Sequence, residues 1–321
     1  MSVRVGLAIG GWPFGPAESE RFWGFIDRAE ALGFDSIWLS DRLVSTAPIL
    51  EPITGLAAVA GRTRTMKFGM SVVVLPLRNP VVLAKEIATI DFLSNGRMLP
   101  AFGIGTEDAR EYEAAGVAKE ERAGRTDEAV ALMRRLWSEE HVTHHGRYYH
   151  VSDVTITPRP VQKSLPVWFG GRSDAAYRRI GRSGDGWLAS FLTTEEFAAG
   201  AAAIRRHAAA AGRSIDEDHY GVILSTTVAR TTAQAKELAG PFLRRFRPDA
   251  AAEELSAFGT PEDVARRIEA YLAAGASKFV LRPACPPDQL LDQLDLLGRE
   301  VAPRFDRTMA PLHADVASTL P

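Results

Sequence analysis

The chain has 321 residues, of which 46% are hydrophobic and 24% charged, and its formal net charge is −2. This balance lacks the basic field that holds a nucleic-acid backbone, so we expect no nucleic-acid partner. The single cysteine, Cys285, excludes an intramolecular disulfide and a cysteine-based metal cluster, and a partly buried, unreactive thiol is the expected role for it. The chain has no apolar stretch of about 18 residues, and residues 1–12 predict a strand instead of a signal peptide, so we expect a cytoplasmic protein without a membrane span.

Strands and helices are predicted to alternate along the chain. Apolar runs predict strands, and amphipathic segments predict the helices between them. The strands are expected at 3–10, 34–40, 67–75, 98–103, 166–170, 186–190, 219–229 and 278–282. The helices are expected at 18–32, 51–60, 80–93, 120–137, 174–182, 194–211, 232–246, 261–274 and 288–301.

The segment 67–105 is the clearest strand–helix–strand unit. Its first strand is apolar enough to be buried on both faces, as parallel strands are. Asn79 and Pro80 predict a helix start, and Gly96 predicts a left-handed cap at the helix end. The second strand finishes in Gly103-Ile104-Gly105. Such a unit implies a parallel sheet, in which the chemistry lies at the carboxyl ends of the strands.

Eight alternating strands favour an α/β fold with a single (β/α)8 barrel over residues 1–321. We expect an excursion after the fourth helix, at 141–166, and an insertion before the eighth strand. The runner-up is an open doubly wound sheet, which usually carries Gly-x-Gly-x-x-Gly after its first strand. Here Gly103-x-Gly105 has Asp108 where the third glycine would lie.

The strand ends contain one candidate anion site. In Gly170-Gly171-Arg172-Ser173, the glycines allow the backbone to approach a phosphate, the helix start that follows attracts it, and Arg172 adds charge. An ordinary strand-to-helix turn is the alternative. The carboxylates Asp41, Glu107 and Asp108 follow other strands and are candidate acids or bases. The alternatives are that Asp41 only pairs with Arg42 or caps a helix, and that Glu107 and Asp108 are solvated loop carboxylates. The histidines 141, 144, 145 and 150 lie in the excursion, so we expect no metal site.

The chain resembles the bacterial luciferase-like monooxygenase superfamily over nearly its whole length. The resemblance is carried by GFDSIWLSD (33–41), SVVVLPLRNPVVLAKEIATIDFLSNGR (71–97), FGIG (102–105), GRTDEAVALMRRLW (124–137), GRYYH…PRPVQ (146–162), VWFGGRSDAAYRRIGRSGDGW (167–187) and GTPEDVARRIEAYLAAGASKFVL (259–281).

This resemblance implies a (β/α)8 barrel that binds FMN or the deazaflavin coenzyme F420, and SVVVLPLRNP is most like the F420 branch. It implies a bulge with a non-prolyl cis peptide at Ser71–Val72, which backs the cofactor ring. Gly105 and Thr106 are expected near that ring, and Gly170–Ser173 at the cofactor phosphate.

The chain departs from the family pattern at the end of the second strand. The F420 branch commonly carries Ser-Asp-His there, with the histidine in proton transfer, whereas this chain has Ser40-Asp41-Arg42. Asp41, Glu107 and Asp108 are therefore the candidate proton partners. Arg42, together with Trp12 and Arg282 at other strand ends, is expected to contact the substrate.

These features predict an F420-dependent oxidoreductase that transfers a hydride between the deazaflavin C5 and a small organic substrate. Its expected partners are the substrate, a second copy in a homodimer, and a separate flavin or F420 reductase as electron source. One alternative is a two-component monooxygenase that uses reduced FMN (FMNH2), which Arg42 and Arg282 would suit. Another is a non-catalytic flavin-binding barrel.

Overall fold

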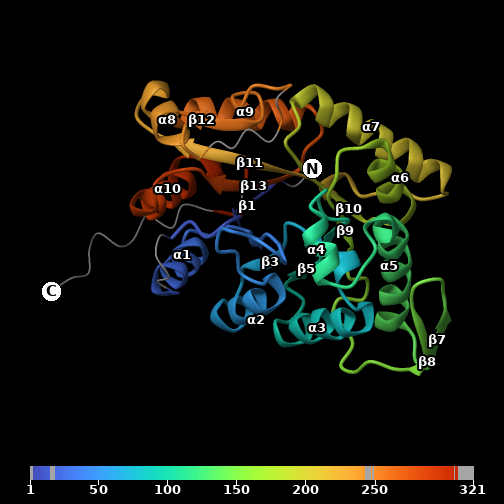
Figure 1. Cartoon of the computed structure of the whole chain (residues 1–321). Coiled ribbons are helices and arrows are strands. Elements are labelled where there is room, and N and C mark those ends of the chain that lie inside the picture. The colour runs from blue at the N-terminus through green and yellow to red at the C-terminus, as the bar shows by residue number, and fades with distance from the viewer. Residues whose placement is uncertain (1–2, 15–18, 243–246, 248, 307, 310–321) are drawn as a thin grey trace. The chain divides into compact units, whose positions relative to one another are not determined.

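The computed structural model describes residues 3–14, 19–242, 247, 249–306 and 308–309. The chain has an α/β fold in which parallel strands are followed by helices (Figure 1). It consists of two compact units, each assembled from separate segments. Unit 1 comprises Met1–Trp38, Ala189–Ala202 and Asp216–Pro321, and unit 2 comprises Leu39–Leu188 and Ala203–Ile215.

Unit 1 has a parallel sheet in which β11 pairs with both β12 and β13, and β13 pairs with β1. Its elements are β1 (Arg4–Ile9), α1 (Ser19–Ala31), most of β2 (Ser36–Leu39), β11 (Tyr220–Val228), α8 (Thr232–Ala239), β12 (Ser256–Gly259), α9 (Pro261–Ala273), β13 (Lys278–Pro283) and α10 (Leu290–Leu296). Two further elements run from one unit into the other, β10 (Gly186–Ser190) and α7 (Thr194–Ala210).

Unit 2 contains the parallel pairs β3–β5, β4–β6, β6–β9 and β9–β10. Its elements are α2 (Pro52–Arg62), β3 (Lys67–Met70), β4 (Val73–Val74), α3 (Pro80–Leu93), β5 (Met98–Leu99), β6 (Ala101–Gly103), α4 (Ala109–Ala114), α5 (Arg122–Ser138), β7 (Val142–His145), β8 (His150–Val154), β9 (Trp168–Phe169) and α6 (Asp174–Ser183). The strands β7 and β8 form an antiparallel hairpin beside α5 (Figure 1).

The start of α3 is as the sequence predicts. The Asn79 side chain accepts the amide N–H groups of Val81 and Val82, and Pro80 occupies the first turn, where its missing N–H costs nothing. The helix ends before Gly96, whose φ of +81° is the left-handed conformation that glycine adopts most easily. The two ends of α3, which connects β4 to β5, are therefore defined by local sequence signals.

The predicted strand at 67–75 is interrupted in the structure. The register pairs Gly69 with Leu99 and then Val73 with Phe102, so three residues on one strand face two on the other. The extra residue makes a bulge that ends β3 at Met70 and starts β4 at Val73. The predicted strand at 98–103 is likewise split at Pro100, which has no backbone N–H to donate.

Two elements were not expected from the sequence, α4 and β12. The predicted helix at 232–246 ends at Ala239, and residues 243–246 lie outside the described residues, as do residue 18 and the tail from 310. The predicted helix at 288–301 is a succession of a 3-10 turn, α10 and the π turn Leu297–Val301.

In the described part of the chain, no helix is long and apolar enough to cross a membrane. The prediction of one domain over 1–321 stays a prediction.

Candidate functional site

In unit 2, the end of β2 is tied to the bulge between β3 and β4. The Ser71 amide donates to the Leu39 carbonyl at 2.8 Å, and the Ser40 and Ser71 hydroxyl oxygens are 3.3 Å apart. The peptide bond between Ser71 and Val72 is cis, as the resemblance implied. The bulge thus places Ser71 and Val72 at the carboxyl end of the sheet, next to the Ser-Asp-Arg segment.

Two glycines leave room for the Val72 side chain. A Cβ added at Gly103, the last residue of β6, would lie 2.7 Å from a Val72 methyl carbon. A Cβ added at Gly170, directly after β9, would lie 3.3 Å from both Val72 methyl carbons. The predicted cofactor residues Val72 and Gly170 are therefore in contact, and glycine is what permits this approach.

The loop after β6 also approaches its neighbours through a glycine. Gly105 has a φ of +84°, and a Cβ there would lie 2.4 Å from the Tyr112 hydroxyl oxygen and 2.7 Å from a Val74 methyl carbon. The Tyr112 hydroxyl lies 2.7 Å from the carbonyl oxygen of Ile104 and 3.0 Å from that of Thr106. Tyr112 is almost fully buried and so fixes the path of this backbone, while Thr106 is exposed.

The predicted phosphate loop, Gly170–Ser173, lies between β9 and α6. Gly171, Arg172 and Ser173 are all exposed, and the Gly171 carbonyl is held by the Trp187 indole N–H at 2.9 Å. Gly171 has a φ of +116°, and a Cβ there would lie 2.7 Å from the Ala176 Cβ. Ser173 caps α6 by accepting the Ala176 amide at 3.3 Å. The exposed loop lies at the positive end of a ten-residue helix.

Asp41 is a buried carboxylate with both oxygens engaged. Oδ2 accepts the Val74 amide at 2.9 Å, and Oδ1 pairs with the Arg78 guanidinium at 2.9 Å. Burial raises the pKa of Asp41, and the charge of Arg78 opposes that rise. Asp41 does not pair with Arg42 among the described contacts, and its cationic partner is Arg78, which the sequence did not suggest.

Arg42 is held by Glu111, a carboxylate that no sequence motif marks. Glu111, on α4, is fully buried, and its Oε1 accepts the Arg42 Nε–H at 3.0 Å and the Leu43 amide at 2.9 Å. The Arg42 Nη2 lies 3.6 Å from Asp108 Oδ2. The loop after β2 and the start of α4 are thus joined through one arginine.

Glu107 and Asp108 are ionised. Hydrogen bonds from Lys119 and Arg122 lower the pKa of Glu107 to about 2. Hydrogen bonds from Arg110 lower the pKa of Asp108 to about 2. Neither shows the burial that would raise its pKa and suit it to donate a proton at neutral pH.

Trp12 and Arg282 belong to unit 1. The Arg282 side chain lies against Gly10, where an added Cβ would be 3.4 Å from Nε. The Trp12 ring packs edge-on against Phe14, with ring centroids 4.8 Å apart. Its indole Nε1 is buried and has no hydrogen-bond acceptor within the described residues.

Most of the chain matches one known protein family. The family model described as "Luciferase-like monooxygenase" matches residues 8–249. The chain belongs to this family. The family resemblance inferred from the sequence is therefore confirmed.

Several relatives of this luciferase-like chain carry the name F420-dependent glucose-6-phosphate dehydrogenase. The protein of that name from Intrasporangium calvum is 38% identical over 202 residues, which are 58% of this chain and 57% of the relative. The protein of that name from Segniliparus rotundus is 28% identical over 95% of this chain and 98% of its own length. In the first of these matches, the chain therefore spans a little more than half of the relative.

Solved structures share the fold of this luciferase-like chain. A monooxygenase from Streptomyces bottropensis superposes with a TM-score of 0.83 at 23% identity, over 94% of this chain and 99% of the other. The F420-dependent tetrahydromethanopterin reductase from Methanopyrus kandleri gives 0.79 at 20% identity, over 95% of this chain and all of the other. Both likenesses establish the fold alone.

Other groups singled out in the sequence have structural partners in this luciferase-like chain. His144, on β7, pairs with Glu128 of α5 at 3.1 Å, and His141 pairs with Asp153 of β8 at 2.6 Å. Cys285 is buried, and its burial raises the pKa of the thiol to about 12, as expected for an unreactive cysteine. No sequence pattern marked Glu111 and Tyr112, which lie in a charged segment without a recognisable period, or Arg78, which lies in the proline-rich turn at 76–80.

Proposed function

We propose that this luciferase-like chain is an F420-dependent oxidoreductase that transfers a hydride between C5 of F420 and a small organic substrate. The observation that carries the proposal is that the Val72 side chain of the Ser71–Val72 bulge fills the space beside Gly103 and Gly170, so the bulge and the two glycines share one surface at the strand ends. The F420-dependent relatives from I. calvum and S. rotundus support the choice of cofactor. We also propose that the strands close into a (β/α)8 barrel around this surface.

The residues present fit such a cofactor. Gly105 and Gly171 both have left-handed backbones, and a Cβ at either would collide with Tyr112 or Ala176, so only glycine lets these two loops keep their backbone paths. The exposed start of α6 offers backbone N–H groups and a positive dipole to a phosphate, and Arg172 adds a charge. Ser71, Val72, Gly105 and Thr106 would support the ring, and Gly170–Ser173 would hold the phosphate. When bound, F420 supplies a carbon centre for two-electron hydride transfer.

The carboxylates differ in what they can contribute. Glu107 and Asp108 are ionised, but pKa values of about 2 make both weak bases, so they are better suited to hold the cationic side chains around them than to accept a proton. Asp41 has a raised pKa but is occupied by Val74 and Arg78, which makes it suited to hold the bulge and to tune charge near the ring. Trp12, Arg42 and Arg282 are the proposed substrate contacts.

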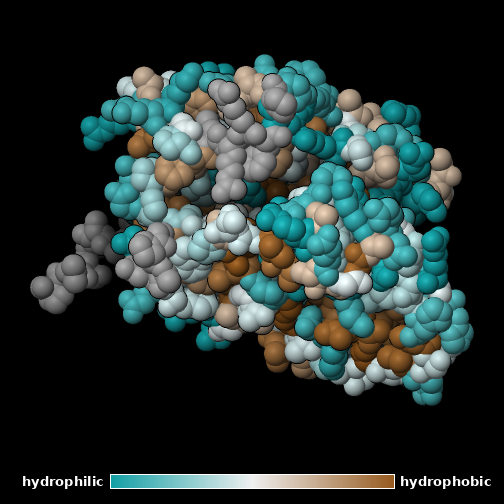
Figure 2. Space-filling view, viewed as in Figure 1, coloured by the Kyte–Doolittle hydropathy of each residue, from teal (hydrophilic) through white to brown (hydrophobic). Residues whose placement is uncertain are grey.

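We also propose that the chain forms a homodimer through α2 and α3. Three large apolar side chains of α3 are exposed: Val82 at 55%, Phe92 at 52% and Leu93 at 76%. Its neighbour α2 exposes only small or polar side chains on its outer face, including Ala57 and Ala58. Hydrophobic residues gather around α3 in the space-filling view (Figure 2). These three exposed apolar side chains need a second apolar surface, and the same patch on a second copy supplies one.

The family description favours one second candidate, a two-component monooxygenase that uses FMNH2 from a separate reductase. The test is a turnover assay on two arms. In one, F420 or its reduced form is offered with a panel of alcohols, sugar phosphates, enones and imines, and the deazaflavin absorbance is followed. In the other, FMNH2 is offered with oxygen, and oxygen uptake is followed. We expect turnover in the first arm and none in the second; oxygen uptake alone would favour the monooxygenase, and silence in both would favour a binding protein.

A further inference from the structure

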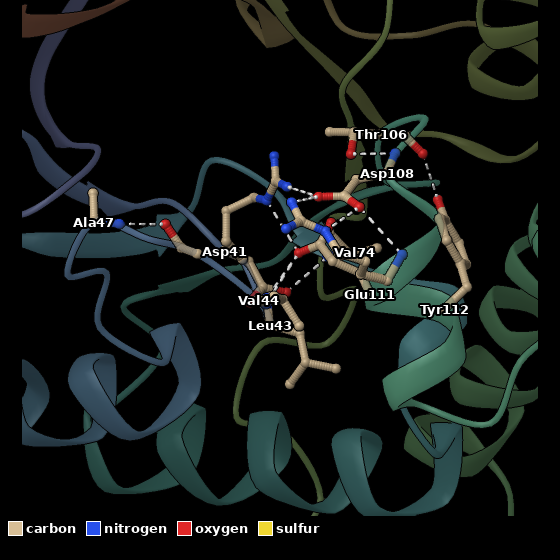
Figure 3. A network of polar contacts seen from close by, with 12 residues as sticks. Asp41, Leu43, Val44, Ala47, Val74, Thr106, Asp108, Glu111 and Tyr112 are labelled. Carbon is tan, nitrogen blue, oxygen red and sulfur yellow. Dashed lines mark hydrogen bonds and ion pairs between the residues drawn. The ribbon is translucent and has the colours of Figure 1, made fainter.

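Glu111 is a buried carboxylate that is only half satisfied. Its side chain is fully inaccessible, and Oε1 accepts three donors, the Arg42 Nε–H, the Leu43 amide at 2.9 Å and the Val44 amide at 3.4 Å. Oε2 is also buried and has no hydrogen-bond partner among the residues that the structure describes. Figure 3 shows Glu111 pointing from α4 toward Leu43 and Val44.

The buried, half-satisfied Glu111 carboxylate does not stabilise the fold. A buried carboxylate oxygen without a partner destabilises the fold, and a buried ion pair is often no better than apolar residues of the same volume. An apolar contact between the loop after β2 and α4 would join the two segments without that penalty. A role in holding Arg42 in one orientation accounts for a charged group at this position.

The Arg42 guanidinium is held by one edge and left open at the other. Nε is bonded to Glu111, whereas Nη2 is 3.6 Å from Asp108 Oδ2, beyond hydrogen-bonding distance. Nη1 has no partner in the described part of the chain. Asp108 is itself occupied by Arg110, with contacts at 2.9 and 2.7 Å. The Arg42 side chain is 31% exposed, so its two terminal nitrogens can still meet a ligand.

We propose that Glu111 is a positioning residue that presents Arg42 to an anionic group, a carboxylate or a phosphate, on the substrate. A guanidinium with a fixed Nε edge keeps its terminal N–H groups in the fork that matches such an anion. The charges around Arg42 favour an anion, because cations outnumber carboxylates among them. The four cations are Arg42, Arg110, Lys119 and Arg122, and the three carboxylates are Glu107, Asp108 and Glu111. This inference rests on the proposed function, since it assigns the substrate class of the same site.

The test uses inorganic phosphate as the probe and calorimetric titration of the full chain, with saturating F420 so that the loop at Gly170–Ser173 is already filled. We expect Arg42→Gln to weaken phosphate binding at least about tenfold, and Glu111→Gln about threefold or more with Arg42 still present. Arg135→Gln is the matched control, because Arg135 also pairs with a carboxylate and is 38% exposed. It should leave phosphate binding unchanged.

A double-mutant cycle separates positioning from mere folding. If Glu111 acts through Arg42, the variant with both substitutions binds phosphate no more weakly than Arg42→Gln alone. Additive losses, unchanged binding in Arg42→Gln, or a wild-type protein that takes up no phosphate would each overturn the inference. If Glu111→Gln does not fold, Arg42→Gln and Arg42→Lys decide it, since lysine lacks the fork and should not restore binding.

The proposed function can fail separately. If the wild-type chain does not bind F420, the same titrations are run without cofactor in an Arg172→Gln background, which removes the charge of the other anion loop. Loss of phosphate binding in Arg42→Gln would then support the anion site at Arg42, although the assignment of F420 as the cofactor would be wrong.

Discussion

The Val74 amide donates a hydrogen bond to Asp41 Oδ2 at 2.9 Å, and this contact ties the end of β2 to the strand that follows the bulge. The other Asp41 oxygen pairs with Arg78, and the Asp41 side chain is only 3% exposed. One carboxylate therefore fixes both the strand β4 and the turn after it. The geometry of the proposed ring support depends on this link.

Removing the Asp41 carboxylate should destabilise the fold. Asp41→Ala leaves the Val74 N–H and the Arg78 guanidinium without their acceptor, and we expect a loss of about 3 kcal/mol in the free energy of unfolding, measured with urea. Glu139→Ala is the matched control, because Glu139 is 47% exposed and forms an i,i+4 pair with Arg135. It should cost less than about 1 kcal/mol. Equal losses in both variants would contradict the role given to Asp41.

The raised pKa of Asp41 predicts a pH dependence. A carboxyl whose folded pKa lies above its unfolded value binds its proton more tightly in the folded state, so its stabilising contribution is complete below 3.8 and is lost as the pH rises through the folded pKa. The free energy of unfolding of the wild-type protein should therefore fall relative to Asp41→Asn as the pH increases above 3.8. Urea titrations of both proteins over a pH series measure this difference. A difference that grows in favour of the wild type with rising pH would show that Arg78 outweighs burial.

A methyl group at Gly171 should block the phosphate loop. Gly171→Ala places a Cβ 2.7 Å from the Ala176 Cβ at a φ of +116°, so the loop has to move. We expect F420 affinity to fall at least about tenfold, measured by fluorescence titration. Gly116→Ala is the control, because Gly116 also has a positive φ of +67° but nothing within 4 Å of an added Cβ. If both variants bind F420 as well as the wild type does, the phosphate lies elsewhere.

A charge on the exposed side of α3 should break the proposed dimer. Leu93 is 76% exposed, and Leu93→Glu would bring two carboxylates into an apolar interface between copies. We expect a shift from dimer to monomer in light scattering coupled to size-exclusion chromatography. Leu291→Glu, at a leucine on α10 that is 46% exposed, should leave the dimer intact. A wild-type protein that is already monomeric would refute the proposed interface.

The sequence predicts the parts of the fold that follow from local rules. Asn79 and Pro80 start α3 as predicted, because capping depends on neighbouring residues alone. The cis bond at Ser71–Val72 was reached through the family resemblance, since no local rule predicts it. The helix α4 was missed because it has only six residues, too few to show a period, and β12 because Ser-Ala-Phe-Gly has no β-branched residue.

The site was harder to predict because its partners are distant in sequence. Arg42 was expected to contact the substrate, but its tie to Glu111, 69 residues later, cannot be read from either segment. Asp41 was weighed as a partner of Arg42 next to it, whereas the structure pairs it with Arg78. Which arginine meets which carboxylate is set by packing, and residue spacing does not encode packing.

The central claim is tested most directly by titrating the purified chain with F420 and, in parallel and without oxygen, with reduced FMN. We predict saturable F420 binding with a Kd on the order of 1 μM or below, and binding of reduced FMN at least about tenfold weaker. Tighter binding of reduced FMN, followed by oxygen consumption when air is admitted, would contradict the assignment.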